Sequence, residues 1–485
     1  MSITSAISSA TSGLSTVSRA AQLVSENVSN ALTEGYARRE IEISSRIVGG
    51  QGAGVKVDGI VRVVDQVLLR DRRMADSDLS YQSTRSGFLQ AASDMIGVPD
   101  DPASLSGQLR AFEAALLEAG SRPDSDTRRS EIVRTCNNLT NKINQASRAV
   151  QAERLVADAA IASQVEQLNE NLVQLQDINV QIIRFKGAGK DATALEEARQ
   201  NLIDDIATIV PVRVIPQSNG SVVLYTQNGG TLLEGKARQF EFTPVSTITA
   251  DMTLASGGLS GLTVDGRPAD TSGNLAPMAG GSLAALFEVR DELAVVAQGR
   301  LDAFSRDLME RFEDPALDAT TAAGAPGLFT DGGAAFDPLD EVGLAGRLEF
   351  SAVVDPAQGG ELRLLRDGLG AAPGGPIGYA DQLYAFADAL TAARLPADTQ
   401  IASSERSATA LAADLASRAA ADLVDGQRSE SFAASRQSSL RDLELQGGVD
   451  TDQELQKLLL IEQAYAANAR VIQTIDDLIQ RLLAI

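Results

Sequence analysis

Apolar residues recur every three or four positions along the last stretch of the chain, from 451 to 485, and neither Pro nor Gly interrupts the pattern. This spacing holds for about four heptads, with one polar exception at Asn468, and it predicts a long helix whose apolar seam packs against a partner helix. Thr451 and Glu454 fit a capping box, which predicts where that helix begins. The seam consists of Leu458, Ile461, Tyr465, Ile472, Ile475, Ile479 and Leu482.

The beginning of the chain repeats this spacing, so the two ends are predicted to form a matched pair of helices. Small residues between the larger ones would let the two backbones approach closely. The alternative from periodicity alone is that these are two ordinary amphipathic helices of a bundle. The N-terminal seam consists of Ile3, Ile7, Ala10, Leu14, Val17, Ala21, Val24, Val28 and Ala31.

The chain between these ends predicts a mainly α fold with inserted β-rich segments. Short strands flank the glycine cluster at 49–54, and from Pro211 to about Met278 strand-like runs alternate with Asn-Gly turns. A hairpin of Leu348–Phe350 with Leu362–Leu364 is expected in the Gly- and Pro-rich stretch. Helices are predicted at 61–96, 105–119, 127–185, 192–210, 282–312, 379–393 and 405–445.

This order predicts a nested organisation in which the terminal helices are outermost and the β-rich inserts lie in the middle of the chain. At 485 residues the chain is too long for one core, so several domains are expected. The predicted parts are a terminal helical assembly domain (1–40 with 447–485), a long-helix domain (41–210 with 282–312 and 377–446), a β-rich insert (211–281) and a Gly/Pro-rich insert (313–376).

Composition narrows the function classes. A formal net charge of −23 argues against binding nucleic acid or an anionic membrane surface, since both need Lys and Arg. No signal peptide is visible at the N-terminus, and no stretch is apolar enough to span a bilayer.

No candidate for catalysis stands out. The chain has no His, which excludes a Ser-His-Asp triad and His-ligated zinc, and its single cysteine, Cys136, fits a buried helical position. The adjacent carboxylates at 100–101, 204–205 and 476–477 are interpreted as solvated charge. We therefore expect no catalytic residue, cofactor, metal or small-molecule substrate.

A motif follows the first helix. It comprises Asn27, Asn30, Thr33, Gly35, Tyr36 and Arg38. It resembles the N-terminal signature of bacterial flagellar axial proteins, Asn-x-x-Asn-x-x-Thr-x-Gly-Tyr-x-Arg. Leu32 and Glu34 depart from the usual Asn and Pro, and Glu at that position is common in the hook-associated branch. The segments 448–450, 463–465 and 469–472 resemble the matching C-terminal signature, with Asp450 where Asn is more usual.

The resemblance covers about 40 residues at each end and implies a structural subunit between hook and filament that assembles through both terminal helices. The implied partners are further copies of the chain, the hook protein, the neighbouring hook–filament junction protein and an export chaperone on the C-terminal helix. The resemblance also implies an extracellular, flagellar location reached without a cleaved signal peptide. We expect the terminal helices to be disordered in the free monomer and to fold on assembly.

Three other hypotheses remain. The chain could be a rod or hook subunit, which shares the N-terminal signature but is usually shorter. It could be a wall hydrolase carried on flagellar helices, although it lacks His and a convergent acid pair. A non-flagellar coiled-coil scaffold would explain the heptads but not the signature at 27–38.

Overall fold

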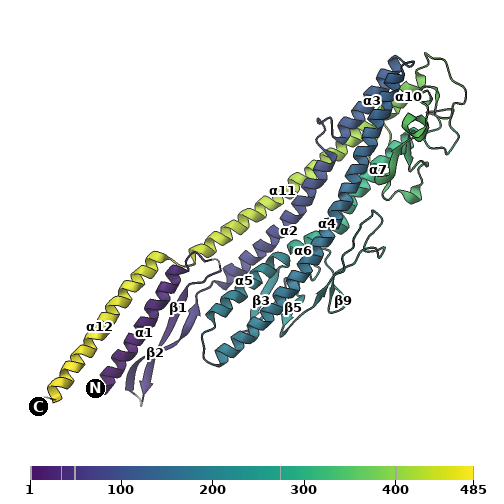
Figure 1. The fold of residues 1–485 in the computed structure, drawn as a ribbon. Helices are drawn as coiled ribbons and strands as arrows, with labels where there is room; N and C mark the ends of the chain where they lie inside the picture. The colour runs from purple at the N-terminus through teal and green to yellow at the C-terminus, as the bar shows by residue number, and fades with distance from the viewer. Residues whose placement is uncertain (1–2, 34, 49–50, 274, 399–400, 484–485) are drawn as a thin grey trace.

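The computed structural model is elongated, and both chain ends lie at the same tip (Figure 1). It describes residues 3–33, 35–48, 51–273, 275–398 and 401–483. Glu34 and the glycines at 49–50 lie outside these ranges. For Ile3 and Leu482 the structure describes the backbone but not the side chain. The expected mainly α fold with β-rich inserts is confirmed.

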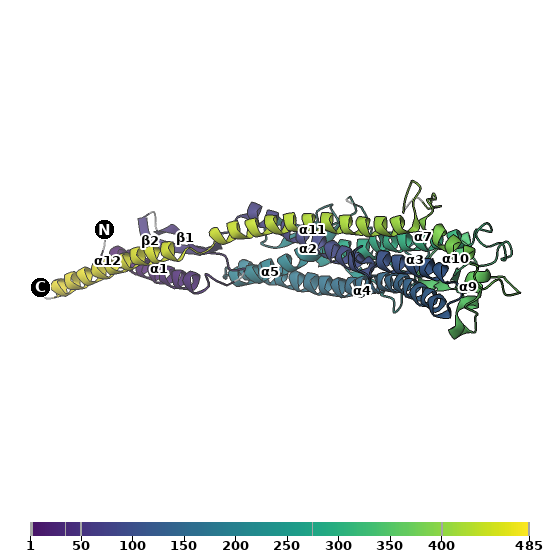
Figure 2. The ribbon, with the colours of Figure 1, turned by 90° about the horizontal axis from the view of Figure 1, so that it is seen from above.

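Long helices run along the molecule and set its length (Figure 2). They are α1 (Ile3–Ser29), α2 (Gln66–Ile96), α4 (Asp126–Gly187), α11 (Ala408–Gln446) and α12 (Thr451–Leu483). The shorter helices are α3 (Leu105–Ser121), α5 (Thr193–Ile209), α6 (Gly281–Glu288), α7 (Ala294–Phe312), α8 (Leu344–Arg347), α9 (Leu364–Asp367) and α10 (Asp381–Thr391).

Side-chain caps fix where several of these helices begin. Asp65 accepts hydrogen bonds from the first backbone N–H groups of α2, and Ser104, Ser125 and Ser407 cap α3, α4 and α11 in the same way. The helix expected from residue 61 therefore starts at Gln66, because the preceding strand continues to Arg62.

The described strands form small antiparallel sheets. A hairpin joins β1 (Arg39–Val48) and β2 (Gln51–Arg62). One sheet has the order β3–β4–β5–β6 (Val212–Pro216, Val222–Thr226, Thr231–Glu234, Lys236–Ala237), and another has the order β7–β8–β9 (Phe240–Glu241, Thr263–Val264, Arg267–Pro268).

The hairpin expected in the Gly/Pro-rich insert was wrong in its partner. β11 (Leu348–Phe350) pairs with β10 (Phe329–Asp331), and residues 364–367 form the short helix α9. The apolar Phe329 and Phe350 lie opposite each other and are both buried. Strand β11 therefore pairs with β10, which precedes it in the sequence, because this pairing buries both rings.

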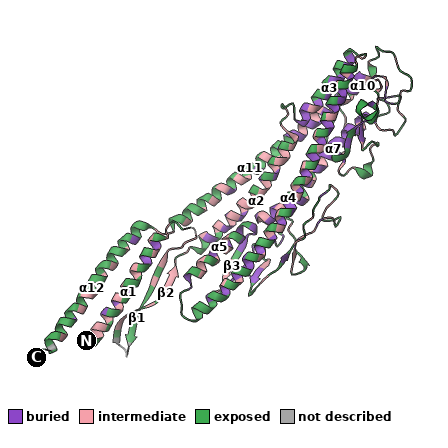
Figure 3. Ribbon diagram, in the orientation of Figure 1, coloured by how far each residue is buried: buried purple, intermediate pink, exposed green. Residues whose placement is uncertain are grey.

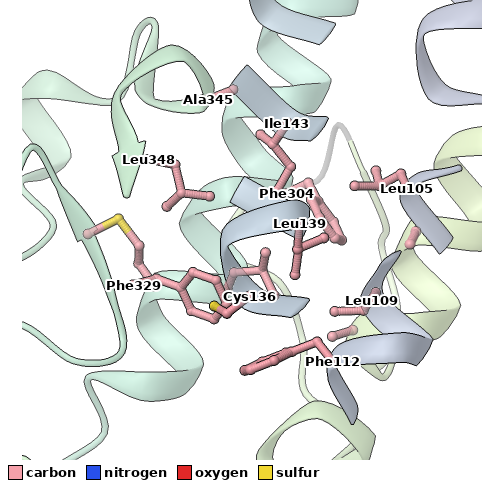
Figure 4. Close-up of a cluster of buried hydrophobic side chains, with 14 of the residues drawn as sticks. Leu105, Leu109, Phe112, Cys136, Leu139, Ile143, Phe304, Phe329, Ala345 and Leu348 are labelled. Carbon is pink, nitrogen blue, oxygen red and sulfur yellow. The ribbon is translucent and has the colours of Figure 1, made fainter. Parts of the chain in front are cut away.

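Two buried apolar clusters hold the molecule together along α4 (Figure 3). The first joins α3, α4, α7 and α10, and Figure 4 shows Phe112, Cys136, Leu139 and Phe329 within it. Cys136 is fully buried there, as its helical position predicted. The second joins the other half of α4 to α5 and the sheets of the 211–281 segment. We call the part built on these clusters the body.

A buried carboxylate on α7 fastens the Gly/Pro-rich insert to the body. Asp302 accepts hydrogen bonds from the backbone N–H groups of Gly343 at 2.9 Å and Ala345 at 2.8 Å, and from the amide of Gln298 at 2.9 Å. Burial is the main cause that raises the pKa of Asp302 to about 6, and these hydrogen bonds offset it only in part.

Replacing Asp302 by Asn should flatten the dependence of stability on pH. The folded-state pKa lies above that of the unfolded chain, so ionisation costs stability as pH rises from about 4 through 6. The free energy of unfolding of the wild type relative to Asp302→Asn should therefore fall between pH 5 and pH 7 by about 1 kcal/mol, roughly half of the loss over the whole titration range. Urea unfolding at both pH values measures this difference. Asp265→Asn is the control: hydrogen bonds lower the pKa of Asp265, so its difference should stay constant in this range.

Candidate functional site

The two ends of the chain form a unit of their own, in which α12 packs along one side of α1 and the β1–β2 hairpin packs on another (Figures 1 and 2). We call α1, α12 and this hairpin the terminal unit. Gly13 permits the close approach of the helices, since a Cβ atom there would lie 3.0 Å from the side chain of Asn468. Neither buried cluster of the body includes a described residue of the terminal unit.

The structure brings only part of the C-terminal seam against α1. Ile475 is buried, and Ile461, Ile472 and Ile479 are partly buried. Leu458 and Tyr465 are 36% and 51% exposed.

On α1, the seam residues Ala10 and Val24 are buried, whereas Ile7, Leu14, Val17 and Val28 are partly buried. Residues that the seam did not include are buried as well: Gly13, Thr16, Leu23 and Asn27. They are buried because α1 is covered on two faces, which a single seam does not predict.

The second cover of α1 is the hairpin, held by a close contact. The hydroxyl of Ser12 accepts a hydrogen bond from the backbone N–H of Val55 at 3.2 Å. Gly54 has φ of +100°, and a Cβ atom there would lie 2.0 Å from Ser12 Oγ. Only glycine therefore fits where the hairpin crosses α1.

Asn27 is the centre of the polar contacts at the base of the terminal unit. Its side chain is fully buried and takes part in four hydrogen bonds. The amide donates to the carbonyl of Arg39 at 3.0 Å and to Glu454 Oε2 at 3.1 Å. The amide oxygen accepts from the hydroxyl of Tyr36 at 2.8 Å and from the backbone N–H of Arg39 at 3.0 Å. Asn27 thus ties α1 to β1, to the loop after α1 and to α12.

The predicted capping box of Thr451 and Glu454 was wrong, because Glu454 contacts Asn27 instead of the start of its own helix. Asp450 caps α12, because its carboxylate accepts from the backbone N–H groups of Asp452 at 2.9 Å and Gln453 at 3.1 Å. Glu454 is instead 1% exposed, bonded to Asn27 and paired with Lys457 at 2.7 Å. A local pattern gave no sign that this carboxylate serves a tertiary contact.

The loop after α1 joins the terminal unit to α5 of the body. Gly35 has φ of +75°, and a Cβ atom there would lie 2.2 Å from the side-chain oxygen of Asn201. Glu197 accepts from the backbone N–H of Ala37 at 3.2 Å and pairs with Arg39 at 2.7 Å. Sequence reasoning missed both α5 residues, because nothing in their local pattern distinguishes them from other polar helix positions.

The remaining signature residues support the loop locally. Asn30 donates to the carbonyl of Glu26 at 2.9 Å and accepts from the hydroxyl of Thr33 at 3.4 Å. The guanidinium of Arg39 lies 5.0 Å from the ring centre of Tyr36. Burial raises the pKa of the Tyr36 hydroxyl, so it stays a neutral donor to Asn27.

These contacts fix the geometry of the terminal unit and of the loop after α1. The described residues contain no group of three or more acidic or Cys side chains placed to hold a metal ion. Nor does any helix within the described ranges have the length and apolar character needed to cross a bilayer.

The expectation that the carboxylate of Asp204 is solvated was wrong. Asp204 pairs with Arg72 and Arg73 of α2, at 2.6 Å each.

Replacing Gly35 by Ala should push the loop away from α5. Two effects combine: the left-handed backbone costs about 1 kcal/mol for a residue with Cβ, and the new methyl meets Asn201. We expect faster proteolysis of the loop at 30–38 in Gly35→Ala. The double variant Gly35→Ala/Asn201→Gly should recover part of the resistance, because it removes the clash but not the backbone strain. Equal cleavage of the two variants would contradict a contact between Gly35 and Asn201.

Comparison with known proteins gives consistent matches to one group. Residues 90–329 match the family described as "Flagellar hook-associated protein FlgK helical domain", and residues 446–485 match "Flagellar basal body rod FlgEFG protein C-terminal". The first match covers the body helices α3–α7, and the second covers α12.

Individual relatives agree. Flagellar hook-associated protein 1 of Salmonella typhimurium is 30% identical over 261 residues, which are 52% of this chain and 47% of that protein. The chain thus matches about half the length of that relative. The protein of the same name from Bacillus subtilis is 21% identical over 97% of this chain and 96% of its own length. A solved hook junction protein from Burkholderia pseudomallei aligns over 54% of this chain at 16% identity, with a TM-score of 0.45.

Proposed function

The chain belongs to the flagellar hook-associated protein 1 family, and we propose that it is a structural subunit of the junction between hook and filament. In this proposal it works by occupying its place in the assembly and catalyses no reaction. The observation that carries the proposal is the terminal unit, whose apolar surface is only partly used within the chain.

The helix α12 keeps a row of large apolar side chains in contact with solvent. They lie outside the contact with α1, and several are about half exposed: Leu455, Leu459, Leu460, Val471 and Leu478. An apolar helix face of this kind is suited to pack against another helix once subunits meet. The terminal unit is therefore the surface through which we propose that the subunits associate.

Association through this surface would be head-to-tail, with unlike patches of neighbouring copies in contact. Contacts of that type generate rings or helical tubes. We propose the residues of both seams and of the signature loop as the interface, together with the exposed leucines of α12. Ordering of the terminal helices would accompany assembly.

The further partners in this proposal are the hook protein on one side and the neighbouring junction protein on the other. An export chaperone would bind α12 before assembly, because the same apolar face would be open in the unassembled chain. The protein would reach the flagellum without a cleaved signal peptide and act outside the cell.

Deletion of residues 451–485 should leave the body folded. No described residue of α12 belongs to either buried cluster, so the helical circular dichroism of the body and its unfolding midpoint should persist. Cells with only this truncated chain should be non-motile. Collapse of the body in circular dichroism and sedimentation would contradict the proposal and favour an ordinary helical bundle.

A point substitution tests the exposed apolar face of α12. In the full chain, Leu459→Asp places a carboxylate on the exposed apolar face, and Gln456→Asp places the same group on an exposed polar position of the same helix. We expect Leu459→Asp to be absent from isolated hook–filament structures, whereas Gln456→Asp is incorporated. Incorporation along the whole hook shaft would instead indicate a hook subunit.

A further inference from the structure

A recess of about 680 Å³ lies where the terminal unit meets the body. Its walls come from β2, the start of α2, the loop between α4 and α5, α5 itself and the β3–β4 turn. Cationic side chains outnumber acidic ones in this wall: Arg19, Arg62, Arg73, Lys186, Lys190 and Arg199 face Asp58, Asp191 and Glu196. In a chain of net charge −23, such an excess of positive charge is unusual.

The acidic residues of the wall are already engaged. Glu196 pairs with Lys186 at 2.6 Å, and Asp58 pairs with Lys56 at 3.0 Å. Asp191 accepts from the backbone N–H of Thr193 at 2.9 Å. Among the described residues, these three carboxylates form no ion pair with an arginine of the recess.

Three arginines of the recess form no ion pair among the described residues: Arg19, Arg62 and Arg199. Arg19 is exposed on α1, whereas Arg62 and Arg199 are partly buried. Arg62 donates through Nη2 to Gln200 Oε1 at 2.9 Å, but its buried Nε has no acceptor. Arg199 donates to the carbonyl of Gly220 at 2.8 Å and to Asn179 at 3.3 Å, both of them neutral groups.

The surroundings make these two charges costly. Burial is the main cause that lowers the pKa of Arg62 and of Arg199, and nearby carboxylates, chiefly Glu196 and Glu197, offset it only in part. A partly buried guanidinium with an unused N–H group is stabilised when an anion accepts from it. The planar fork of arginine fits the two oxygens of a carboxylate.

We propose that this recess binds carboxylate side chains of an acidic segment on a second copy of the chain. The proposal rests on the function proposed above, in which copies associate through the terminal unit. The recess adjoins that unit, since β2 and Arg19 of α1 form part of its wall. The occupant follows from charge: each copy carries 65 Asp and Glu against 42 Lys and Arg, so a neighbouring surface supplies carboxylates.

The first experiment measures binding to the isolated full chain with a fluorescent hexaglutamate peptide. Arg62→Gln/Arg199→Gln removes the two partly buried unpaired charges and should weaken binding at least ~10-fold, because each lost charged hydrogen bond costs about that factor. Arg134→Gln is the matched control, since Arg134 is exposed on α4 and lies outside the recess. If the double variant does not fold, Lys190→Gln on the exposed rim should give a smaller but measurable loss.

Inorganic phosphate tests the chemistry of the anion. Hexaglutamate binding that phosphate displaces only at much higher concentration supports the proposal. Phosphate binding without peptide binding, or peptide binding that is equal in the wild type and in Arg62→Gln/Arg199→Gln, overturns it.

The second experiment identifies the occupant with a photo-crosslinking residue in place of Lys190. A cross-link to another copy of this chain, in isolated flagella or in concentrated solution, supports the proposal. A cross-link only to a different protein overturns it. A wrong proposal of the junction function gives a different result from a wrong proposal of the recess. In that case the chain is absent from flagella, while its peptide binding and its cross-links in solution can still be measured.

Discussion

Replacing Asn27 by Leu is expected to detach the terminal unit from its base. The substitution keeps the size of the side chain but removes all four hydrogen bonds, and it leaves Glu454 buried without its amide donor. The combined loss should be about 3–5 kcal/mol, because unpaired buried polar groups each cost about 1–3 kcal/mol. Cells with Asn27→Leu should be non-motile.

Hydrogen exchange of the assembled protein measures the effect directly, because the terminal helices are proposed to become ordered on assembly. Exchange should speed up in α1, α12 and the hairpin, while the body stays protected. Asn30→Leu is the control, with the same substitution three residues further along the same signature. Asn30 is partly exposed and bonds only within its own turn, so that variant should lose less than about 1 kcal/mol and retain motility. Equal effects of the two substitutions would refute the central role of Asn27.

Replacing Arg290 by Met should release the loop at 243–262 from the body. Arg290 is fully buried, pairs with Asp158 at 2.7 Å and donates to the carbonyl of Ser260 at 3.0 Å. It also lies 5.0 Å from the ring centre of Phe287. Removal leaves Asp158 as a buried charge without its cation, for which a loss of about 3–5 kcal/mol is expected. Urea unfolding followed by circular dichroism measures this loss.

Two further variants test the cause. Arg238→Met breaks an exposed ion pair with Asp265 in the same insert, where both side chains are more than 40% exposed, and should cost at most about 1 kcal/mol. Adding Asp158→Asn to Arg290→Met removes the stranded charge and should recover part of the stability. No recovery would mean that lost packing, and not the buried charge, explains the effect.

The sequence predicted the elements well because their signals are local. The periodicity of residues 127–185 led to α4, and the Asn-Gly turns after Pro211 led to the small sheets. The predictions failed where the structure of a segment depends on a partner that is distant in the sequence. β11 pairs with β10 because Phe329 and Phe350 are buried together, and no pattern within 348–364 reports that.

The residues of the candidate site also fall into those that a local sequence pattern indicated and those that only distant contacts bring in. The signature drew attention to Asn27, Gly35 and Tyr36, and the structure places all three in contacts at the base of the terminal unit. Periodicity predicted the seam positions, of which Leu458 and Tyr465 stay exposed. Glu454 was assigned to the cap because its spacing from Thr451 fits one, yet the structure uses it for Asn27. The contacts of Glu197 and Asn201 span more than 150 residues of chain, so only the folded structure could show them.

The long helix α4 has a mechanical consequence. Its 62 residues correspond to about 90 Å, and both buried clusters are attached to it along that length. A force applied at the terminal unit along the long axis is therefore carried by α4, which is packed against both clusters. The backbone hydrogen bonds of this helix run parallel to that force. The joint beneath it consists of the described residues of the loop at 30–38 and the glycines at 447–448, none of which belongs to either buried cluster. Under torque the body would turn as one rigid lever, and the compliance of the subunit would be concentrated in this joint.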